Sequence, residues 1–285
     1  MGMELGRIGI WSIELRFGDP AEASRAATEL EALGFGAIWI PGAIDDRILA
    51  DVDRLLDATS TVAIGTGIIN VWKVAAADVG RWWQALPADR RARLMLGFGV
   101  SHGPAIGEQY GKPLATMAAY LDGLDATGVP AAHRCLAALG PKMLDLARDR
   151  TAGAHPYLVT ARHTAEARER LGPGGLLAPE QGVILETDPA RARAIGRAAL
   201  SSYQHFPNYK NNWRRLGYTE EDIVGSDRLI DDLFLWGDHD RITAGVQAHF
   251  DAGADHVCLQ LIRGEMGSHT SMPIEEWRTL ARMLL

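Results

Sequence analysis

Apolar segments and amphipathic segments alternate eight times along this chain, and that alternation restricts its possible folds more than any single motif does. Each apolar segment has the length of a buried strand and is followed by a segment with helical periodicity. The predicted strands cover residues 7–11, 37–40, 62–64, 93–97, 133–138, 154–159, 181–185 and 256–261. Strands that alternate with helices form parallel sheets. Eight units in 285 residues predict an α/β fold, a single (β/α)8 TIM-barrel domain over residues 1–285, with a doubly wound sheet as the alternative.

Cap residues mark the ends of several predicted helices. Asp19 followed by Pro20 is typical of an N-cap and a first helical position, and Gly34 stands where glycine ends helices. Residues 206–232, after the seventh unit, are more than a barrel connection needs, so we predict an insertion there. At that point of a barrel it would lie near the C-terminal face, where it either covers a pocket or forms an ordinary surface excursion.

Composition restricts the partners of the chain. A net charge of -7 argues against a nucleic-acid or anionic membrane surface. Residues 1–11 lack the apolar core of a signal peptide, and no apolar run approaches the ~20 residues of a membrane helix. Cys135 and Cys258 both lie in apolar runs, as small core residues do in a reducing compartment. We therefore expect a cytoplasmic protein that acts on a small-molecule substrate and has no nucleic-acid or membrane partner.

Binding groups of a TIM barrel lie on the loops that follow its strands. The residues at those positions here are Trp11, Ser12, Glu14, Pro41, Gly42, Ala43, Gly67, Ile68, Asn70, Trp72, Gly99, Ser101, His102, Gly140, Pro141, Lys142, His155, Arg263 and Glu265. The set is rich in glycine and aromatic residues and poor in carboxylates. It suits a large planar ligand better than a sugar cleaved by paired acids.

Residues 62–73, VAIGTGIINVWK, join a short apolar strand to two glycines and then to polar and aromatic side chains. Glycine in a strand marks a bulge or the close approach of another backbone or a ligand. The stretch is therefore either a binding edge or a strand that ends in a plain turn, and its residues alone favour neither.

Residues 138–143, ALGPKM, are the best candidate for a phosphate site. A strand followed by glycine and a helix start leaves free N–H groups at a helix end that favours an anion, and Lys142 would add positive charge. A plain turn with proline at the first helical position explains the same residues equally simply.

Several common catalytic motifs are missing from the chain. Residues 97–102 lack the last glycine of a dinucleotide fingerprint, and there is no phosphate-binding P-loop, H-E-x-x-H or G-x-S-x-G motif. No histidine cluster has metal-ligand spacing, so we expect no metal. His102 and His155 are the histidines at strand ends, each either a general acid or base or a hydrogen-bonded structural residue.

Five segments, taken in order, resemble the luciferase-like monooxygenase superfamily and, within it, the deazaflavin (coenzyme F420)-dependent oxidoreductases. They are GFGAIWIPG (34–42), VAIGTGIINVWK (62–73), RLMLGFGVSHG (93–103), AALGPKMLDLARDRTAGAHPYLVT (137–160) and ITAGVQAHFDAGADHVCLQLI (242–262). PNYKNNWRRLGY and APEQGVIL resemble one actinobacterial-type subgroup.

The resemblance implies a barrel that binds a flavin-like cofactor at its C-terminal end, commonly as a homodimer. It implies a non-proline cis peptide at Gly67–Ile68 that would back the deazaflavin ring, and a cofactor phosphate at Gly140, Pro141, Lys142 and Met143. Asn70, Gly99 and Val100 match positions of the cofactor wall. Trp11, Trp72, His155, Asn208 and Tyr209 would line the substrate side.

The chain departs from some relatives at two positions. Gly42 and Ala43 stand where these relatives carry an Asp-His pair, and His102 stands where they carry an acid. His102 thus becomes the candidate catalytic proton donor or acceptor, unless the substrate exchanges its proton with water. We expect an oxidoreductase that moves a hydride between C5 of the deazaflavin and a small organic substrate. The alternatives are an FMN-dependent monooxygenase and a non-catalytic cofactor-binding protein of the same fold.

Overall fold

A computed structural model describes residues 4–42, 45–264 and 271–285 of the chain. In this part of the chain, ten strands form one sheet in the order β7-β6-β5-β4-β3-β2-β1-β10-β8-β9, and every neighbouring pair is parallel. The strands are β1 (Ile8–Trp11), β2 (Ala37–Ile40), β3 (Ala63–Asn70), β4 (Leu94–Gly99), β5 (Arg134–Leu136), β6 (Gly153–Ala154), β7 (Leu176–Leu177), β8 (Glu180–Ile184), β9 (Phe234–Trp236) and β10 (Val257–Leu261).

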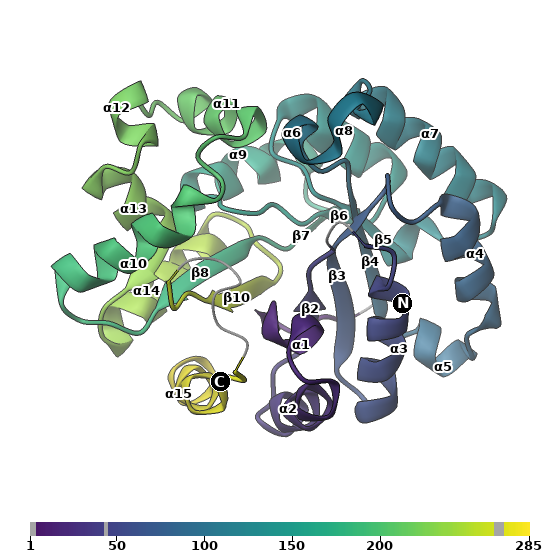
Figure 1. Ribbon diagram of the computed structural model, residues 1–285, viewed down its shortest axis with the longest axis horizontal. Coiled ribbons are helices and arrows are strands. Elements are labelled where there is room, and N and C mark those ends of the chain that lie inside the picture. Colours follow the sequence, from purple (N-terminus) through teal and green to yellow (C-terminus); the bar gives the residue numbers. More distant parts are fainter. Residues whose placement is uncertain (1–3, 43–44, 265–270) are drawn as a thin grey trace.

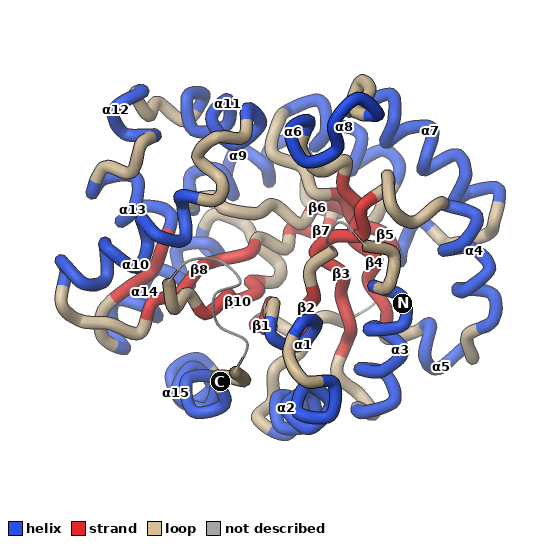
Figure 2. The backbone as a smooth tube through the Cα atoms, viewed as in Figure 1, coloured by secondary structure: helices blue, strands red, loops and turns tan. Residues whose placement is uncertain are grey.

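Helices surround the curled sheet, as Figures 1 and 2 show. They are α1 (Glu14–Phe17), α2 (Pro20–Ala32), α3 (Ile48–Ala58), α4 (Ala76–Ala85), α5 (Ala88–Arg91), α6 (Gly103–Ile106), α7 (Pro113–Ala126), α8 (Pro141–Arg150), α9 (Ala161–Leu171), α10 (Pro189–Ser201), α11 (Pro207–Arg215), α12 (Glu220–Ile223), α13 (Asp227–Leu233), α14 (His239–Asp251) and α15 (Ile274–Leu284). Two short 3-10 helices, η1 (Gly107–Gln109) and η2 (Ala131–His133), complete the described elements.

Most strand residues are apolar, as expected for a sheet that is buried on both faces. All residues of β1, β2, β4 and β10 are buried, as expected when helices cover one face and side chains fill the interior of a curled sheet. Asp19 caps α2 by accepting hydrogen bonds from the first-turn N–H groups of Ala21 and Glu22, as its sequence position predicts.

Backbone hydrogen bonds connect the two ends of the strand order. Glu180 N donates to Pro156 O beyond β6, and Cys258 N of β10 donates to Pro179 O. The segment that carries β7 and β8 therefore lies between β6 and β10. This arrangement brings the carboxyl ends of the strands to one side of the molecule.

The predicted alternation of strands and helices is confirmed, with differences in detail. The structure has ten parallel strands in place of eight, because β7 and β9 are short strands that pair with β6 and β8. The third strand does not end at Ile64: β3 continues through Gly65 and Gly67 to Asn70. Gly65 lies inside β3, and glycine fits there because a Cβ would lie 2.4 Å from the Trp39 ring.

The segment predicted as an insertion consists of helices. Residues 206–232 contain α11, α12 and most of α13, which lie together beside α10 in Figure 1. Tyr209, Trp213 and Leu216 of this segment pack in a core cluster with Leu158. None of the helices in the described ranges is long and apolar enough to cross a membrane.

Candidate functional site

A cavity of about 450 Å³ lies at the carboxyl ends of the strands. This volume is in the range that binds small molecules and cofactors. The lining comes from α1, from the carboxyl ends of β1 to β6 and the loops after them, from the segment that leads into α7, from the start of α8, and from the segment after α10 with the first turn of α11. It consists of Trp11, Ile13, Phe17, Pro41, Gly42, Gly67, Ile68, Asn70, Gly99, Val100, Ser101, His102, Tyr110, Pro113, Ala137, Ala138, Leu139, Gly140, Met143, His155, Tyr157, Tyr203, Asn208 and Tyr209.

Twelve of the fifteen site residues predicted from the sequence line this cavity. They are Trp11, Gly67, Ile68, Asn70, Gly99, Val100, His102, Gly140, Met143, His155, Asn208 and Tyr209. Trp72, Pro141 and Lys142 are outside the lining. Trp72 instead contacts a lining residue from outside the cavity: its Nε1 donates a hydrogen bond to Val100 O at 2.8 Å. Ala43 and Glu265, two other predicted strand-end positions, lie outside the described residues.

The end of β3 forms a bulge at one wall of the cavity. We call this wall the floor; it consists of Gly67 and Ile68 with the rings of Trp11 and His155. The Gly67–Ile68 peptide is cis, as expected, and the register between β3 and β4 is irregular between Thr66 and Ile69. Gly67 O accepts a hydrogen bond from Trp11 Nε1 at 3.1 Å. A Cβ on Gly67 would lie 2.5 Å from Trp11 Nε1 and 2.6 Å from His155 Nε2. Glycine at 67 therefore keeps both rings against the bulge.

Two more glycines allow the neighbouring loops to approach Ile68. A Cβ on Gly42 would lie 1.7 Å from Ile68 O, and a Cβ on Gly99 would lie 2.7 Å from Ile68 Cδ1. Side chains at 42 or 99 would therefore push the loops after β2 and β4 away from the bulge. Asn70 is buried at the same strand end, and its Oδ1 accepts from Trp72 N at 3.1 Å.

His102 connects the loop after β4 to the helical segment above it. Its Nδ1 lies 2.9 Å from Asn208 Oδ1, and its ring stacks on Phe206 with 4.2 Å between ring centroids. Since Asn208 Oδ1 accepts, Nδ1 carries the proton and Nε2 carries the lone pair. Burial lowers the pKa of His102, and the hydrogen bond to Asn208 opposes that effect in part. The neutral ring is therefore the main form near pH 7.

His155 lines the cavity beside the Gly67 bulge. Its ring stacks on Trp39 with 4.4 Å between centroids, and its Nδ1 lies 2.7 Å from Ala178 O. Burial lowers the pKa of His155 to about 4; the bond to Ala178 opposes the shift and nearby His256 adds to it. The ring is therefore neutral at pH 7.

The amino end of α8 faces the cavity through Gly140 and Met143. Gly140 is the N-cap, and a Cβ there would meet nothing within 4 Å. The turn is thus open above the helix end, which is the geometry that receives a phosphate.

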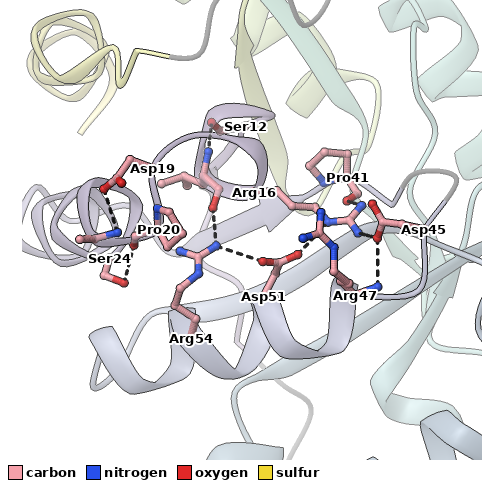
Figure 3. Close-up of polar contacts among 12 residues, drawn as sticks. Ser12, Arg16, Asp19, Pro20, Ser24, Pro41, Asp45, Arg47, Asp51 and Arg54 are labelled. Carbon is pink, nitrogen blue, oxygen red and sulfur yellow. Dashed lines mark hydrogen bonds and ion pairs between the residues drawn. The ribbon is translucent and has the colours of Figure 1, made fainter.

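A buried arginine, Arg16, connects α1 to the segment after β2 and to α3, and Figure 3 shows these contacts. Arg16 of α1 donates to Pro41 O at 2.8 Å and to Asp51 of α3 at 3.0 Å, and it also pairs with Asp45. Arg54 donates to Leu15 O at 2.8 Å. These bonds fix α1, with the lining residue Phe17 at its end, against the end of β2.

Solved structures resemble this chain over nearly its whole length. An F420-dependent secondary alcohol dehydrogenase, in complex with an F420-acetone adduct, has a TM-score of 0.71 and 14% sequence identity, covering 98% of each chain. The coenzyme F420-dependent tetrahydromethanopterin reductase of Methanopyrus kandleri has a TM-score of 0.67 and 14% identity, covering 98% of each chain. The oxygenating constituent of 3,6-diketocamphane monooxygenase from Pseudomonas putida, a type II Baeyer-Villiger monooxygenase in complex with FMN, has a TM-score of 0.66 and 13% identity, covering 100% of this chain and 98% of its own.

The chain shares the fold of these solved structures. No protein-family profile matches the sequence, and no curated protein does. Identities of 13–14% establish the fold and leave the chemistry to the site residues.

Sequence reasoning missed part of this cavity. Tyr157 and Tyr203 line it, and the Tyr157 hydroxyl lies 3.2 Å from the Tyr203 hydroxyl and 2.9 Å from Gln260 Oε1. Tyr157 follows His155 by two residues, so its position after β6 was a usable signal. Tyr203 follows α10, and nothing in the sequence places it near the cavity.

Glu180 is a buried carboxyl group close to these tyrosines. Its Oε2 accepts from Leu158 N at 3.2 Å, while Oε1 has no hydrogen-bond partner among the described residues. Burial raises the pKa of Glu180 to about 8, and the bond from Leu158 opposes the shift. Glu180 is therefore mostly protonated at pH 7.

Proposed function

We propose that this chain is an oxidoreductase that transfers a hydride between C5 of coenzyme F420 and a small organic substrate. The observation that carries the proposal is the cavity at the carboxyl end of β3, where Gly67 and Ile68 line a space together with other glycines and aromatic rings. The neighbours of the same fold include two proteins described as F420-dependent, which supports this choice of cofactor.

The residues of the cavity fit a planar cofactor with a phosphate. Gly42 and Gly99 let the neighbouring loops pack closely around Ile68, and all three residues line the space where a flat ring would rest. The open turn at Gly140 would receive the phosphate, with Met143 beside it. When bound, the deazaflavin would supply the hydride acceptor or donor at C5.

The chain itself would orient the substrate, exclude water and move the proton. Trp11, Tyr157, Tyr203 and Tyr209 form an apolar wall above the floor. Asn208 holds the His102 ring with Nε2 as the lone-pair atom. His102 would accept the proton of an alcohol as the hydride leaves, or return it to a carbonyl in the reverse direction. Trp72, which we predicted as a substrate contact, would support the wall through its hydrogen bond to Val100 O. Lys142, which we predicted as a phosphate contact, is exposed and outside the lining.

An FMN-dependent monooxygenase is the second candidate. It is favoured by the neighbour in complex with FMN and by a second neighbour of the same fold, the monooxygenase RslO1 from Streptomyces bottropensis. The two candidates share the cavity and differ in cofactor and in the use of oxygen.

Titration with each cofactor separates these candidates. We expect oxidised F420 to bind, with a change in its fluorescence, and FMN to bind much more weakly. Tight FMN binding with no response to F420 would reject the first proposal and favour the monooxygenase.

Turnover tests whether the cofactor-bound chain is an enzyme. Reduced F420 should be oxidised in the presence of some members of a panel of carbonyl and enone compounds. Binding of F420 without oxidation by any of them would favour a non-catalytic cofactor-binding protein. We also propose that the chain acts in the cytoplasm as a homodimer, which size-exclusion chromatography with light scattering would test.

A further inference from the structure

The floor of the cavity contains one polar atom whose hydrogen-bonding capacity is unused. His155 lies at the end of β6 and is 1% exposed, and its Nε2 has no hydrogen-bond partner among the described residues. The same side chain lines the cavity. Buried polar atoms are almost always paired, so an unpaired one on a side chain that lines a cavity indicates a missing partner.

The tautomer of His155 follows from its surroundings. Nδ1 lies 2.7 Å from Ala178 O, which can only accept, so Nδ1 carries the proton. Cys258 Sγ lies 3.6 Å from the same Nδ1, but its thiol donates to Pro179 O at 3.4 Å and so leaves the Nδ1 proton to Ala178. Nε2 is then a lone-pair acceptor and cannot donate.

The direction of Nε2 follows from Gly67. A Cβ on Gly67 would lie 2.6 Å from His155 Nε2 and 2.5 Å from Trp11 Nε1. Trp11 Nε1 is already used, because it donates to Gly67 O. Nε2 therefore lies close against the bulge, where the absence of a side chain at 67 makes room for it. Because it carries a lone pair, a donor group is its only suitable partner.

We propose that His155 Nε2 is a binding atom that accepts a hydrogen bond from an O–H or N–H group of the bound ligand. The inference rests on the proposed function, because the ligand is either the F420 ring or the substrate that reacts with it. If the donor belongs to the substrate, the site selects the hydroxyl form of the substrate over its carbonyl form, because a carbonyl brings no proton to Nε2.

Two variants separate the acceptor from the rest of the side chain. In His155→Asn the amide N–H replaces the Nδ1 bond to Ala178 O and leaves nothing at the Nε2 position. In His155→Gln the amide oxygen can reach the Nε2 position. His133→Asn is the matched control, because His133 Nδ1 also bonds a backbone carbonyl, Leu94 O at 2.9 Å, outside the cavity.

Binding is measured by the fluorescence of F420 and by nitrogen NMR of protein labelled at its nine histidines. The probes are F420, cyclohexanol and cyclohexanone, and the last two are nearly equal in size while only the alcohol donates. His155→Asn identifies the His155 signals by their loss. We expect the Nε2 signal to move when its donor binds. The affinity for that donor should fall about threefold to tenfold in His155→Asn, with recovery in His155→Gln and no change in His133→Asn.

The outcomes distinguish the sources of the donor. A shift with F420 alone assigns the donor to the cofactor, and a shift with cyclohexanol but not cyclohexanone assigns it to the substrate. No shift with any probe, or equal shifts with alcohol and ketone, would overturn the inference. If F420 does not bind the wild-type protein, the proposed function fails, and the response to the two cyclohexyl probes still decides the role of Nε2. If His155→Asn does not fold, His155→Gln identifies the signals and the wild-type spectra decide.

Discussion

Replacing Gly67 with alanine tests the packing of the cavity floor. The added Cβ would lie 2.5 Å from Trp11 Nε1 and 2.6 Å from His155 Nε2, and both rings are buried. Overpacking of this kind costs about 1–3 kcal/mol. If the Trp11 ring withdraws, its hydrogen bond to Gly67 O is also lost, at a further cost of about 1 kcal/mol. We therefore expect Gly67→Ala to lower the free energy of unfolding by about 2–4 kcal/mol.

Denaturant unfolding followed by tryptophan fluorescence measures this loss, and F420 titration of the same variant measures binding. Gly174→Ala is the control, because Gly174 is exposed and a Cβ there would meet nothing within 4 Å. The control should unfold within about 0.5 kcal/mol of the wild type. A Gly67→Ala protein with wild-type stability and wild-type F420 affinity would refute the reasoning, because it would show that neither ring needs the space at 67.

Three further predictions concern charge. Glu180→Gln should stabilise the protein at pH 9 relative to the wild type. The folded-state pKa of Glu180 is about 8 and exceeds the ordinary value of 4.5, so the wild-type free energy of unfolding falls by up to about 1.4 kcal/mol per pH unit between these values. Melting curves from pH 5 to 9 should show this slope only with glutamate present. Arg16→Met should lower the free energy of unfolding by about 2–4 kcal/mol, because Pro41 O and two carboxylates lose their buried partner. Arg81→Met, which removes an exposed ion pair, should lower it by less than about 0.5 kcal/mol. Equal losses in chemical unfolding would contradict this ranking. For alcohol oxidation, kcat should rise with pH through a midpoint below 6.5, because the neutral His102 ring accepts the proton. His102→Ala should lower kcat about a hundredfold and abolish that rise. Full turnover in the variant would show that His102 does not transfer the proton.

The alternation of strands and helices was predictable because the strands of a sheet buried on both faces are continuous apolar runs. The second strand was predicted at the bounds that the structure shows for β2, Ala37–Ile40. The third was cut short at Ile64 because glycine usually weakens a strand. In the structure Gly65 makes room for the Trp39 ring, which comes from the neighbouring strand. A single sequence does not reveal such a contact between strands.

The cavity was predictable where residues directly follow strands and much less so elsewhere. Gly67, Gly99 and His155 all follow this rule, and the resemblance added the cis peptide. Tyr203 reaches the cavity only through the path of the chain after α10. Glu180 stands at the start of β8 and is buried by residues from other parts of the chain, so its raised pKa has no local sequence signal.

A crystal structure of the protein with F420 tests the central proposal most directly. We predict that the deazaflavin ring lies against the Gly67–Ile68 peptide, within hydrogen-bonding or stacking distance of the cavity floor, and that the phosphate lies at the turn formed by Gly140 and Met143. A complex in which the cofactor binds outside this cavity, or in which the ring lies away from the β3 bulge, would contradict the proposed function.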